Sequence, residues 1–161
     1  MRTGEIAQLR AKAQTKPRRI LVVEDEDDIR ELLAELLSSS LENVLVEDRP
    51  NAQEALKAMA ANPPDLIITD YKMPGMNGLD FLAHVRLQQP NVPAILVTAF
   101  PDLDIAVRAI NEARVQSFLQ KPIDPPQVVR VVGGILTAFS QRVDPNQGIR
   151  PVESQRLQRL G

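Results

Sequence analysis

The chain has 161 residues, of which 43% are hydrophobic and 25% charged, as expected for one soluble globular domain with a buried core. It has no cysteine and a single histidine, His84, which excludes disulfides, thiolate metal sites and histidine-cluster metal sites. The net charge of −2 is uneven: residues 1–19 carry six basic side chains and one acidic one, whereas the acidic central part carries −8, which argues against nucleic acid as its direct partner.

A basic extension, residues 1–17, comes first in the chain, and we expect it to be a flexible, solvated tail. It lacks the apolar core of a signal peptide. The longest wholly aliphatic run that follows, Ile20–Val23, is far too short to cross a bilayer. We therefore expect a cytoplasmic protein that does not enter a membrane.

Five short aliphatic runs predict the strands of a parallel sheet that is covered by helices on both faces. They are Ile20–Val23, Val44–Val46, Leu66–Ile68, Ala94–Val97 and Val115–Leu119. The first four are apolar almost throughout, and two polar residues interrupt the last.

Helical patterns separate these strands, because apolar residues recur there at the spacing of one buried helix face. Five helices are predicted, with apolar faces over residues 29–37, 52–60, 79–85, 105–110 and 128–139. Asn51, followed three residues later by Glu54, predicts the cap of the second helix.

The alternation of strands and helices predicts an α/β fold, a single doubly wound five-stranded parallel sheet with five helices. We expect this domain to span residues 18–142. Residues 143–161 form a tail or linker too short to fold alone, so we expect either a stand-alone domain or the front of a longer protein. Ligands of such folds bind at the carboxyl ends of the strands.

Polar residues follow four of the predicted strands. A run of five acidic residues, 24–28, follows the first, Asp70 the third, Thr98 the fourth and Lys121 the fifth. Taken singly, each is typical of a cap or a surface residue, and the last two acidic residues simply favour the first turn of a helix. Because these strand ends meet at one edge of the sheet, together they predict a functional site.

The charges at this edge predict a divalent cation. Glu24, Asp25 and Asp70 bring three negative charges together, and two carboxylates about 4 Å apart repel by roughly 4 kcal/mol at an effective dielectric of 20. Lys121 offsets one charge, and a divalent cation would offset the other two. Carboxylate and carbonyl oxygens, without cysteine or a histidine cluster, select Mg²⁺ or Mn²⁺ over zinc.

Four segments resemble the receiver domain of bacterial two-component response regulators, the CheY-like, flavodoxin-like family. They are Ile20–Asp25, Asp65–Gly78, Ala94–Ala99 and Phe118–Pro122, and the likeness covers roughly residues 18–142. The resemblance implies a phosphoacceptor switch that receives a phosphoryl group from a sensor histidine kinase or a phosphotransfer protein. It also implies that the domain catalyses only its own phosphorylation and dephosphorylation.

The resemblance assigns roles to the strand-end residues. Asp70 becomes the phosphoacceptor, and Lys121 pairs with the phosphoryl group. Asp25 and Asp70 ligate the metal directly, Glu24 holds it through water or at its edge, and the backbone carbonyl of Lys72 supplies another ligand. Mg²⁺ is the implied cofactor, with Mn²⁺ as an alternative.

The resemblance also implies a conformational switch. Thr98 senses the phosphoryl group through its hydroxyl, and Phe118, three residues before Lys121, is the switch aromatic residue. The face formed by the fourth helix, the fifth strand and the fifth helix would then bind a partner or form a homodimer. The receiver itself is expected to bind neither nucleic acid nor a membrane.

Further positions follow from the same resemblance. The Met73-Pro74-Gly75 turn and Gly78 shape the loop after the phosphoacceptor, and the peptide bond before Pro122 is expected to be cis.

Two residues are expected to tune the lifetime of the phosphorylated form. Lys72 and Phe100 stand two positions after Asp70 and Thr98, and the resemblance implies that residues at these two positions flank the path of an attacking water. A phenyl ring cannot orient water, and an ammonium group could hold phosphoryl charge, so both favour slow loss of phosphate.

The sequence departs from the family pattern at two places. Glu24 occupies a position where aspartate is commoner, which keeps the charge on a longer side chain. Residues 118–121 lack the Ala-Asp-Asp-Tyr pattern typical of winged-helix regulators, so the output class stays open.

Other readings fit less well. A flavodoxin-like cofactor binder needs a Ser/Thr/Gly-rich loop after the first strand, and a P-loop NTPase needs a glycine-rich loop ending in Gly-Lys. An aspartyl-phosphate phosphatase needs an aspartate where Lys72 stands. A histidine phosphotransfer domain is all-helical, whereas His84 lies in a helix of an α/β pattern, so we expect His84 to be a surface residue. The remaining alternative is a protein-binding pseudo-receiver that is never phosphorylated.

Overall fold

The structure, a computed structural model, describes residues 3–99 and 102–142 and contains the predicted five-stranded, all-parallel sheet. The strand order is β2-β1-β3-β4-β5, so the chain reverses its direction along the sheet once, when it passes from β2 over β1 to β3. The strands are β1 (Arg18–Val23), β2 (Val44–Arg49), β3 (Leu66–Asp70), β4 (Ala94–Thr98) and β5 (Ser117–Gln120). The predicted fold class is confirmed.

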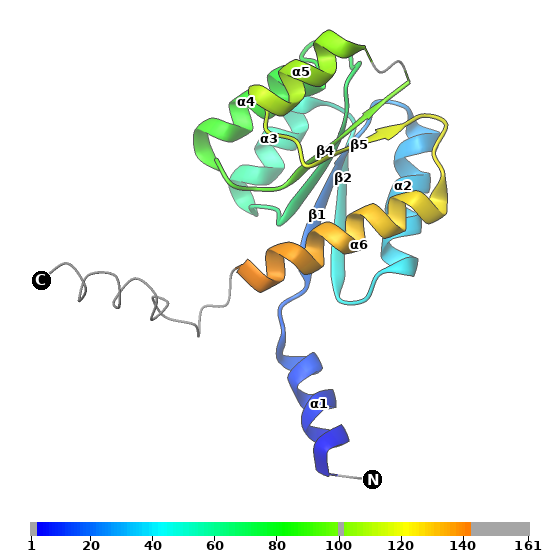
Figure 1. Ribbon diagram of the computed structural model, residues 1–161, viewed down its shortest axis with the longest axis vertical. Coiled ribbons are helices and arrows are strands. Elements are labelled where there is room, and N and C mark those ends of the chain that lie inside the picture. The colour runs from blue at the N-terminus through cyan, green and yellow to red at the C-terminus, as the bar shows by residue number, and fades with distance from the viewer. Residues whose placement is uncertain (1–2, 100–101, 143–161) are drawn as a thin grey trace, which may run out of the picture.

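Helices cover both faces of the sheet, as the aliphatic strands require (Figure 1). One face carries α3 (Ala52–Ala61), α4 (Gly78–Gln88) and α5 (Leu103–Asn111), and the other carries α2 (Asp27–Ser40) and α6 (Pro125–Arg142). All five predicted helices are therefore present: four connect successive strands, and the fifth, α6, follows β5.

The core consists of two apolar clusters, one on each side of the sheet. Leu21 and Val23 of β1 pack into the cluster under α3, α4 and α5, whereas Ile20 and Val22 pack into the cluster under α2 and α6. Successive strand side chains point to opposite faces, so a strand buried on both faces has to be apolar at every position. Full burial of each such side chain contributes about 1.5–3 kcal/mol.

The capping prediction for the second helix is confirmed. The Asn51 side chain accepts a hydrogen bond of 2.8 Å from the Glu54 backbone N–H. Asn77 caps α4 in the same way, accepting from the Asp80 N–H at 2.9 Å. These contacts satisfy backbone donors that a helix leaves without partners in its first turn.

The fifth strand begins two residues later than the prediction, at Ser117, because α5 ends in a tight backbone turn. The Val115 N–H donates to the Ala109 carbonyl at 3.0 Å, and Arg114 has a φ of 52°. This is the left-handed ending that usually takes glycine. Pairing with β4 starts only where Ser117 lies opposite Ile95.

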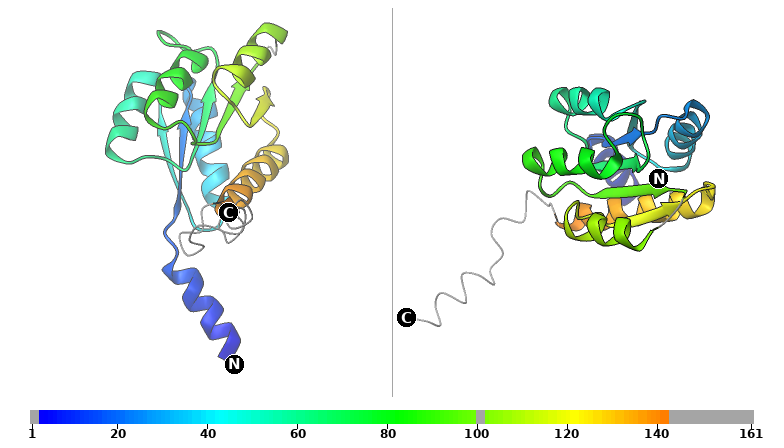
Figure 2. Two further views of the ribbon diagram at one scale, coloured as in Figure 1. Left: turned by 60° about the vertical axis from the view of Figure 1, so that its left-hand side comes forward. Right: turned by 90° about the horizontal axis from the view of Figure 1, so that it is seen from above.

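A sixth helix, α1 (Thr3–Gln14), lies in the basic extension, for which no helix was predicted. The segment has no apolar stripe to signal one. Figures 1 and 2 show α1 pointing away from the sheet, and the side chains of residues 3–8 are exposed. Within residues 3–99 and 102–142, no helix combines the length and the apolar character that spanning a membrane requires.

Candidate functional site at the carboxyl edge of the sheet

A cleft of about 520 Å³ opens at the carboxyl edge of the sheet and brings five of the predicted site residues together. Asp25, Asp70, Lys72, Thr98 and Lys121 all line it. Asp70 and Thr98 are the last residues of the neighbouring strands β3 and β4, and Lys121 directly follows β5. Parallel pairing therefore collects side chains that are far apart in the sequence.

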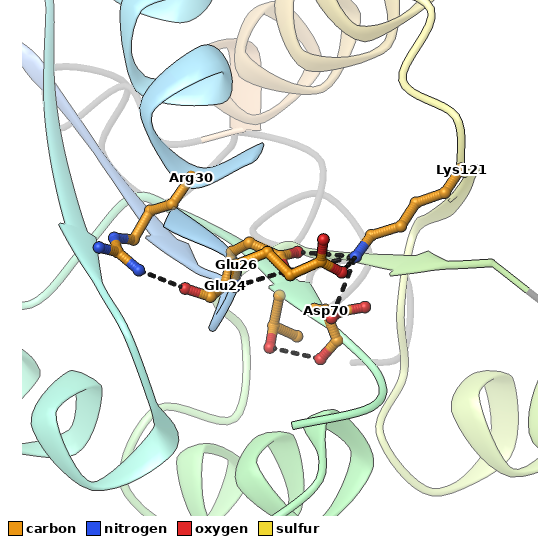
Figure 3. Close-up of polar contacts among 6 residues, drawn as sticks. Glu24, Glu26, Arg30, Asp70 and Lys121 are labelled. Carbon is orange, nitrogen blue, oxygen red and sulfur yellow. Dashed lines mark hydrogen bonds and ion pairs between the residues drawn. The ribbon is translucent and has the colours of Figure 1, made fainter. Parts of the chain in front are cut away.

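The Lys121 ammonium is the centre of the polar contacts (Figure 3). Its Nζ atom lies 3.2 Å from Asp70 Oδ2, 3.2 Å from each carboxylate oxygen of Glu24, and 3.5 Å from Glu26 Oε1. The side chains of Glu24 and Asp70 are only 1% and 5% exposed. One positive charge thus faces two buried carboxylates and a third at the rim.

Burial and the unbalanced charge shift the pKa values of these groups. Burial, followed by the neighbouring charge of Asp70, raises the pKa of Glu24 to about 7 against the opposing effect of Lys121. Burial also raises the pKa of Asp70, and again Lys121 opposes the change. Burial acts to lower the pKa of Lys121, but Asp70 and Glu24 together outweigh it and raise that pKa.

The carboxylates fit a hard divalent cation. Glu24, Asp25 and Asp70 each place one oxygen within 4.8 Å of the others. Glu24 Oε2 is fully buried and accepts no hydrogen bond, although it lies near Lys121. A buried carboxylate whose only nearby cation is an ammonium shared with two other carboxylates is an unfavourable arrangement that a metal cation would relieve. The donor set, all oxygen, suits Mg²⁺ or Mn²⁺ chemistry.

The loop after Asp70 is held tightly against the start of α4. The Gly78 N–H donates to the Tyr71 carbonyl at 2.7 Å, and the Tyr71 N–H donates to Val97 at 2.9 Å. A Cβ atom at Gly78 would lie 2.2 Å from the Asp70 carbonyl oxygen, so only glycine allows this approach. Gly75 turns the loop at a φ of 80°. The predicted loop-shaping glycines therefore have clear structural reasons.

The predicted switch residues lie beside the cleft in neighbouring strands. Thr98 is buried at the end of β4. Phe118 pairs with Leu96 across β4 and β5 and is half-buried against the apolar cluster that also contacts Ile105 of α5. The peptide bond between Lys121 and Pro122 is cis, as expected.

Two residues at the site were not assigned a role from the sequence. Arg30 of α2 donates to the Glu24 carbonyl at 2.9 Å and to Asp27 at 2.6 Å, and lies 3.6 Å from Asp48 at the end of β2. Glu26 lines the cleft and forms an ion pair with Lys121 (Figure 3). The sequence of an acidic run does not indicate which of its members faces Lys121, because this lysine lies 97 residues beyond Glu24 in the chain.

Two other sequence predictions concern residues away from these contacts. His84 is exposed on α4, where its Nδ1 lies 2.9 Å from the Asp80 carbonyl oxygen of the same helix, so its surface position is confirmed. Lys72 is exposed at the rim of the cleft. Phe100, its predicted counterpart in tuning phosphate lifetime, lies outside the described residues.

Comparison with known proteins places the chain among signalling proteins. The family model of the response regulator receiver domain matches residues 20–133. The DNA-binding transcriptional regulator NtrC of Escherichia coli is 32% identical over 126 residues, which are 78% of this chain and 26% of that protein. The response regulator protein PilR of Pseudomonas aeruginosa is 34% identical over 139 residues, 85% of this chain and 29% of its own length. The chain thus spans little more than a quarter of these relatives.

Solved structures that this chain covers almost from end to end give the same result. A signal receiver domain from an HD domain-containing protein of Pseudomonas fluorescens has a TM-score of 0.73 and 29% identity, covering 78% of this chain and 99% of that domain. A CheY-like response regulator receiver domain protein from Methanospirillum hungatei has a TM-score of 0.72 and 26% identity, covering 80% of this chain and 100% of that one.

Proposed function

The chain belongs to the family of response regulator receiver domains, and from this premise we propose that Asp70 accepts the phosphoryl group. A role in two-component phosphorelay signalling follows from the family. The observation that supports Asp70 is its position: it ends β3 at the floor of the cleft, and its carboxylate contacts Lys121.

The proposed reaction is nucleophilic attack by an Asp70 carboxylate oxygen on phosphorus. The new oxygen–phosphorus bond forms while the bond from phosphorus to the donor breaks, and the electron pair leaves with the donor's imidazole or acetate. Lys121 lies 3.2 Å from the Asp70 carboxylate, so its ammonium can follow the negative charge as it moves onto the phosphoryl oxygens. Thr98, buried at the neighbouring strand end, would donate its hydroxyl to one of those oxygens.

A divalent cation, Mg²⁺ or Mn²⁺, would be held by Asp25 and Asp70, with Glu24 at its edge and the Lys72 carbonyl as a further ligand. When bound, it supplies positive charge that screens the carboxylates from the incoming phosphoryl group. The chain's own contribution is to hold three acidic side chains within 4.8 Å of one another, an arrangement that is unfavourable without a cation.

The proposal extends to partners and lifetime. A sensor histidine kinase or a phosphotransfer protein donates the phosphoryl group, and the domain catalyses nothing beyond its own phosphorylation and dephosphorylation. Lys72, exposed at the rim, slows the loss of phosphate by holding phosphoryl charge, and Phe100 acts with it by covering the group. Replacing Phe100 with alanine should therefore speed the decay of the phosphorylated protein.

Labelling by radioactive acetyl phosphate in Mg²⁺ buffer tests the phosphoacceptor. Wild type should take up label, and EDTA should abolish uptake. Asp70→Asn should stay folded, because the amide occupies the same volume, yet take up no label. Full labelling of Asp70→Asn would overturn the assignment. Absence of label in the wild type from both acetyl phosphate and a phosphorylated kinase would instead favour the alternative, a pseudo-receiver that only binds proteins.

A further inference from the structure

Glu26 reaches across the cleft to the lysine that the proposed reaction needs. Its Oε1 atom lies 3.5 Å from Lys121 Nζ, a contact drawn in Figure 3, and its side chain is 61% exposed. It lines the same cleft as Asp70 and Thr98. Among the three carboxylates that face Lys121, Glu26 alone has room to move into water, because Glu24 and Asp70 are buried.

The backbone around Glu26 is fixed although its side chain is exposed. Glu26 is the N-cap residue of α2, and its N–H donates to Glu24 Oε1 at 3.2 Å. N-cap side chains usually accept a hydrogen bond from the first turn of their helix. The Glu26 side chain makes no such bond and contacts Lys121 instead. The residue is thus anchored at its backbone with its carboxylate directed at the ammonium.

A phosphoryl group on Asp70 would compete with this contact. A lysine ammonium has three donors, and Glu24, Glu26 and Asp70 already surround the one on Lys121. The incoming phosphoryl oxygens carry negative charge and need Lys121 for themselves. They would also meet the Glu26 carboxylate at close range, where like charges repel.

We propose that Glu26 is a positioning residue that holds Lys121 before phosphorylation and slows phosphoryl uptake by competing for its ammonium. This inference rests on the proposed function of Asp70. Removing the Glu26 charge should have two opposite effects, weaker metal binding and faster phosphoryl uptake, because the same carboxylate attracts a metal cation and repels a phosphoryl group. A residue with a merely structural role in the loop would, when replaced, weaken both kinds of binding.

Two variants and a matched control separate these effects. Glu26→Gln removes the charge and keeps the shape, whereas Glu26→Asp keeps the charge on a side chain too short to hold Lys121. Asp28→Asn removes the same charge from the exposed first turn of α2, outside the cleft. Mg²⁺ affinity is measured from the emission of Tyr71, the only tyrosine in a chain without tryptophan. Uptake is measured with acetyl phosphate at saturating Mg²⁺.

Glu26→Gln should bind Mg²⁺ roughly two- to fivefold more weakly and yet take up label roughly three- to tenfold faster, as expected for one charge at this range. Added salt should reduce both differences, since exposed charges are screened. Glu26→Asp should bind Mg²⁺ like the wild type and label at an intermediate rate. Asp28→Asn should change uptake less than twofold.

Uptake by Glu26→Gln at or below the wild-type rate would overturn the inference while leaving Asp70 as the phosphoacceptor. An equal acceleration of phosphoryl uptake by Asp28→Asn and by Glu26→Gln would also overturn it. The net negative charge of the domain, and not the contact between Glu26 and Lys121, would then set the rate of uptake. A wild-type chain that takes up no label would overturn the proposed function first, and this inference with it.

Discussion

At the scale of single residues, burial has its clearest effect on the pKa of Glu24. Its carboxylate is almost completely buried, one of its oxygens accepts no hydrogen bond, and its pKa is raised to about 7 by burial and by Asp70. A folded-state pKa above the unfolded value means that the folded chain binds the proton more tightly. The metal-free fold is therefore favoured at acidic pH and opposed by the ionised Glu24 at neutral pH.

This predicts a pH-dependent free energy of unfolding in EDTA. The Glu24 contribution is fully present below the unfolded pKa of 4.5 and is lost as pH rises through about 7. The loss should be on the order of 2 kcal/mol between pH 5 and pH 8. Urea unfolding at three pH values measures it, and Glu24→Gln should make the decline shallower, leaving the part that the raised pKa of Asp70 contributes. A wild-type profile without this decline would contradict the burial argument.

A second prediction at this scale concerns the metal. Asp25→Ala should weaken Mg²⁺ binding about tenfold or more, because it removes one of the three carboxylates that lie within 4.8 Å of one another. Asp28→Ala, an exposed change in the same acidic run, should have less than a twofold effect. Tyr71 emission during a Mg²⁺ titration reports both. Equal effects would mean that the acidic run is only a solvated surface.

At the scale of elements, the first turn of α4 determines where the end of β3 lies. Gly78 opens this helix against the backbone of Asp70, and no side chain fits between them. The two glycines of α6 differ, because a Cβ atom at Gly134 would have no atom within 4 Å and one at Gly133 would make an ordinary contact with Leu41. Whether a glycine can be replaced therefore depends on how closely other atoms approach its Cα atom.

Gly78→Ala should therefore lower the free energy of unfolding by about 1–3 kcal/mol or more and reduce phosphoryl uptake, because the helix has to move away from Asp70. Gly134→Ala is the matched control and should raise stability by about 0.5–1 kcal/mol, since alanine favours an exposed helix position. Urea unfolding and acetyl phosphate labelling measure the two effects. Similar stability for both variants would show that the close approach at Gly78 relaxes easily.

At the scale of the whole molecule, the cleft and the surface of α5, β5 and α6 are connected through two strands. Thr98 lies at the cleft end of β4, and Phe118 of β5 and Ile105 of α5 pack against the same apolar cluster. Leu103, Val107 and Ile110 of α5 are exposed apolar side chains at helical spacing. Binding of a partner or a second copy on this surface stays a prediction.

A phosphoryl mimic should change this surface. Beryllofluoride bound at Asp70 should draw Thr98 toward the cleft and let Phe118 turn into the space released, which shifts the population between two packings. The NMR signals of Phe118 and Ile105 should move on addition of beryllofluoride with Mg²⁺. Thr98→Ala should abolish these movements while beryllofluoride still binds. Unchanged Phe118 signals in the loaded wild type would argue against the coupling.

The sequence alone predicted the five strands, the five helices that cover them and the place of the candidate site. Strands that are apolar at every position predict a sheet covered on both faces, and helical spacing predicts the helices between them. Polar residues at strand ends predict the cleft, because parallel topology sends those ends to one edge. Asp25, Asp70, Thr98 and Lys121 are predicted in this way, and all four line the cleft.

Only the tertiary structure decided contacts between side chains from different elements. The acidic run has five members, and packing alone buries Glu24, directs Glu26 to Lys121 and leaves Asp28 exposed. The late start of β5 depends on a left-handed turn at Arg114, a residue that does not signal one. These cases share one physical reason. Local sequence patterns indicate whether a segment forms a helix or a strand, whereas burial and ion pairing depend on distances between side chains that are defined only in the packed molecule.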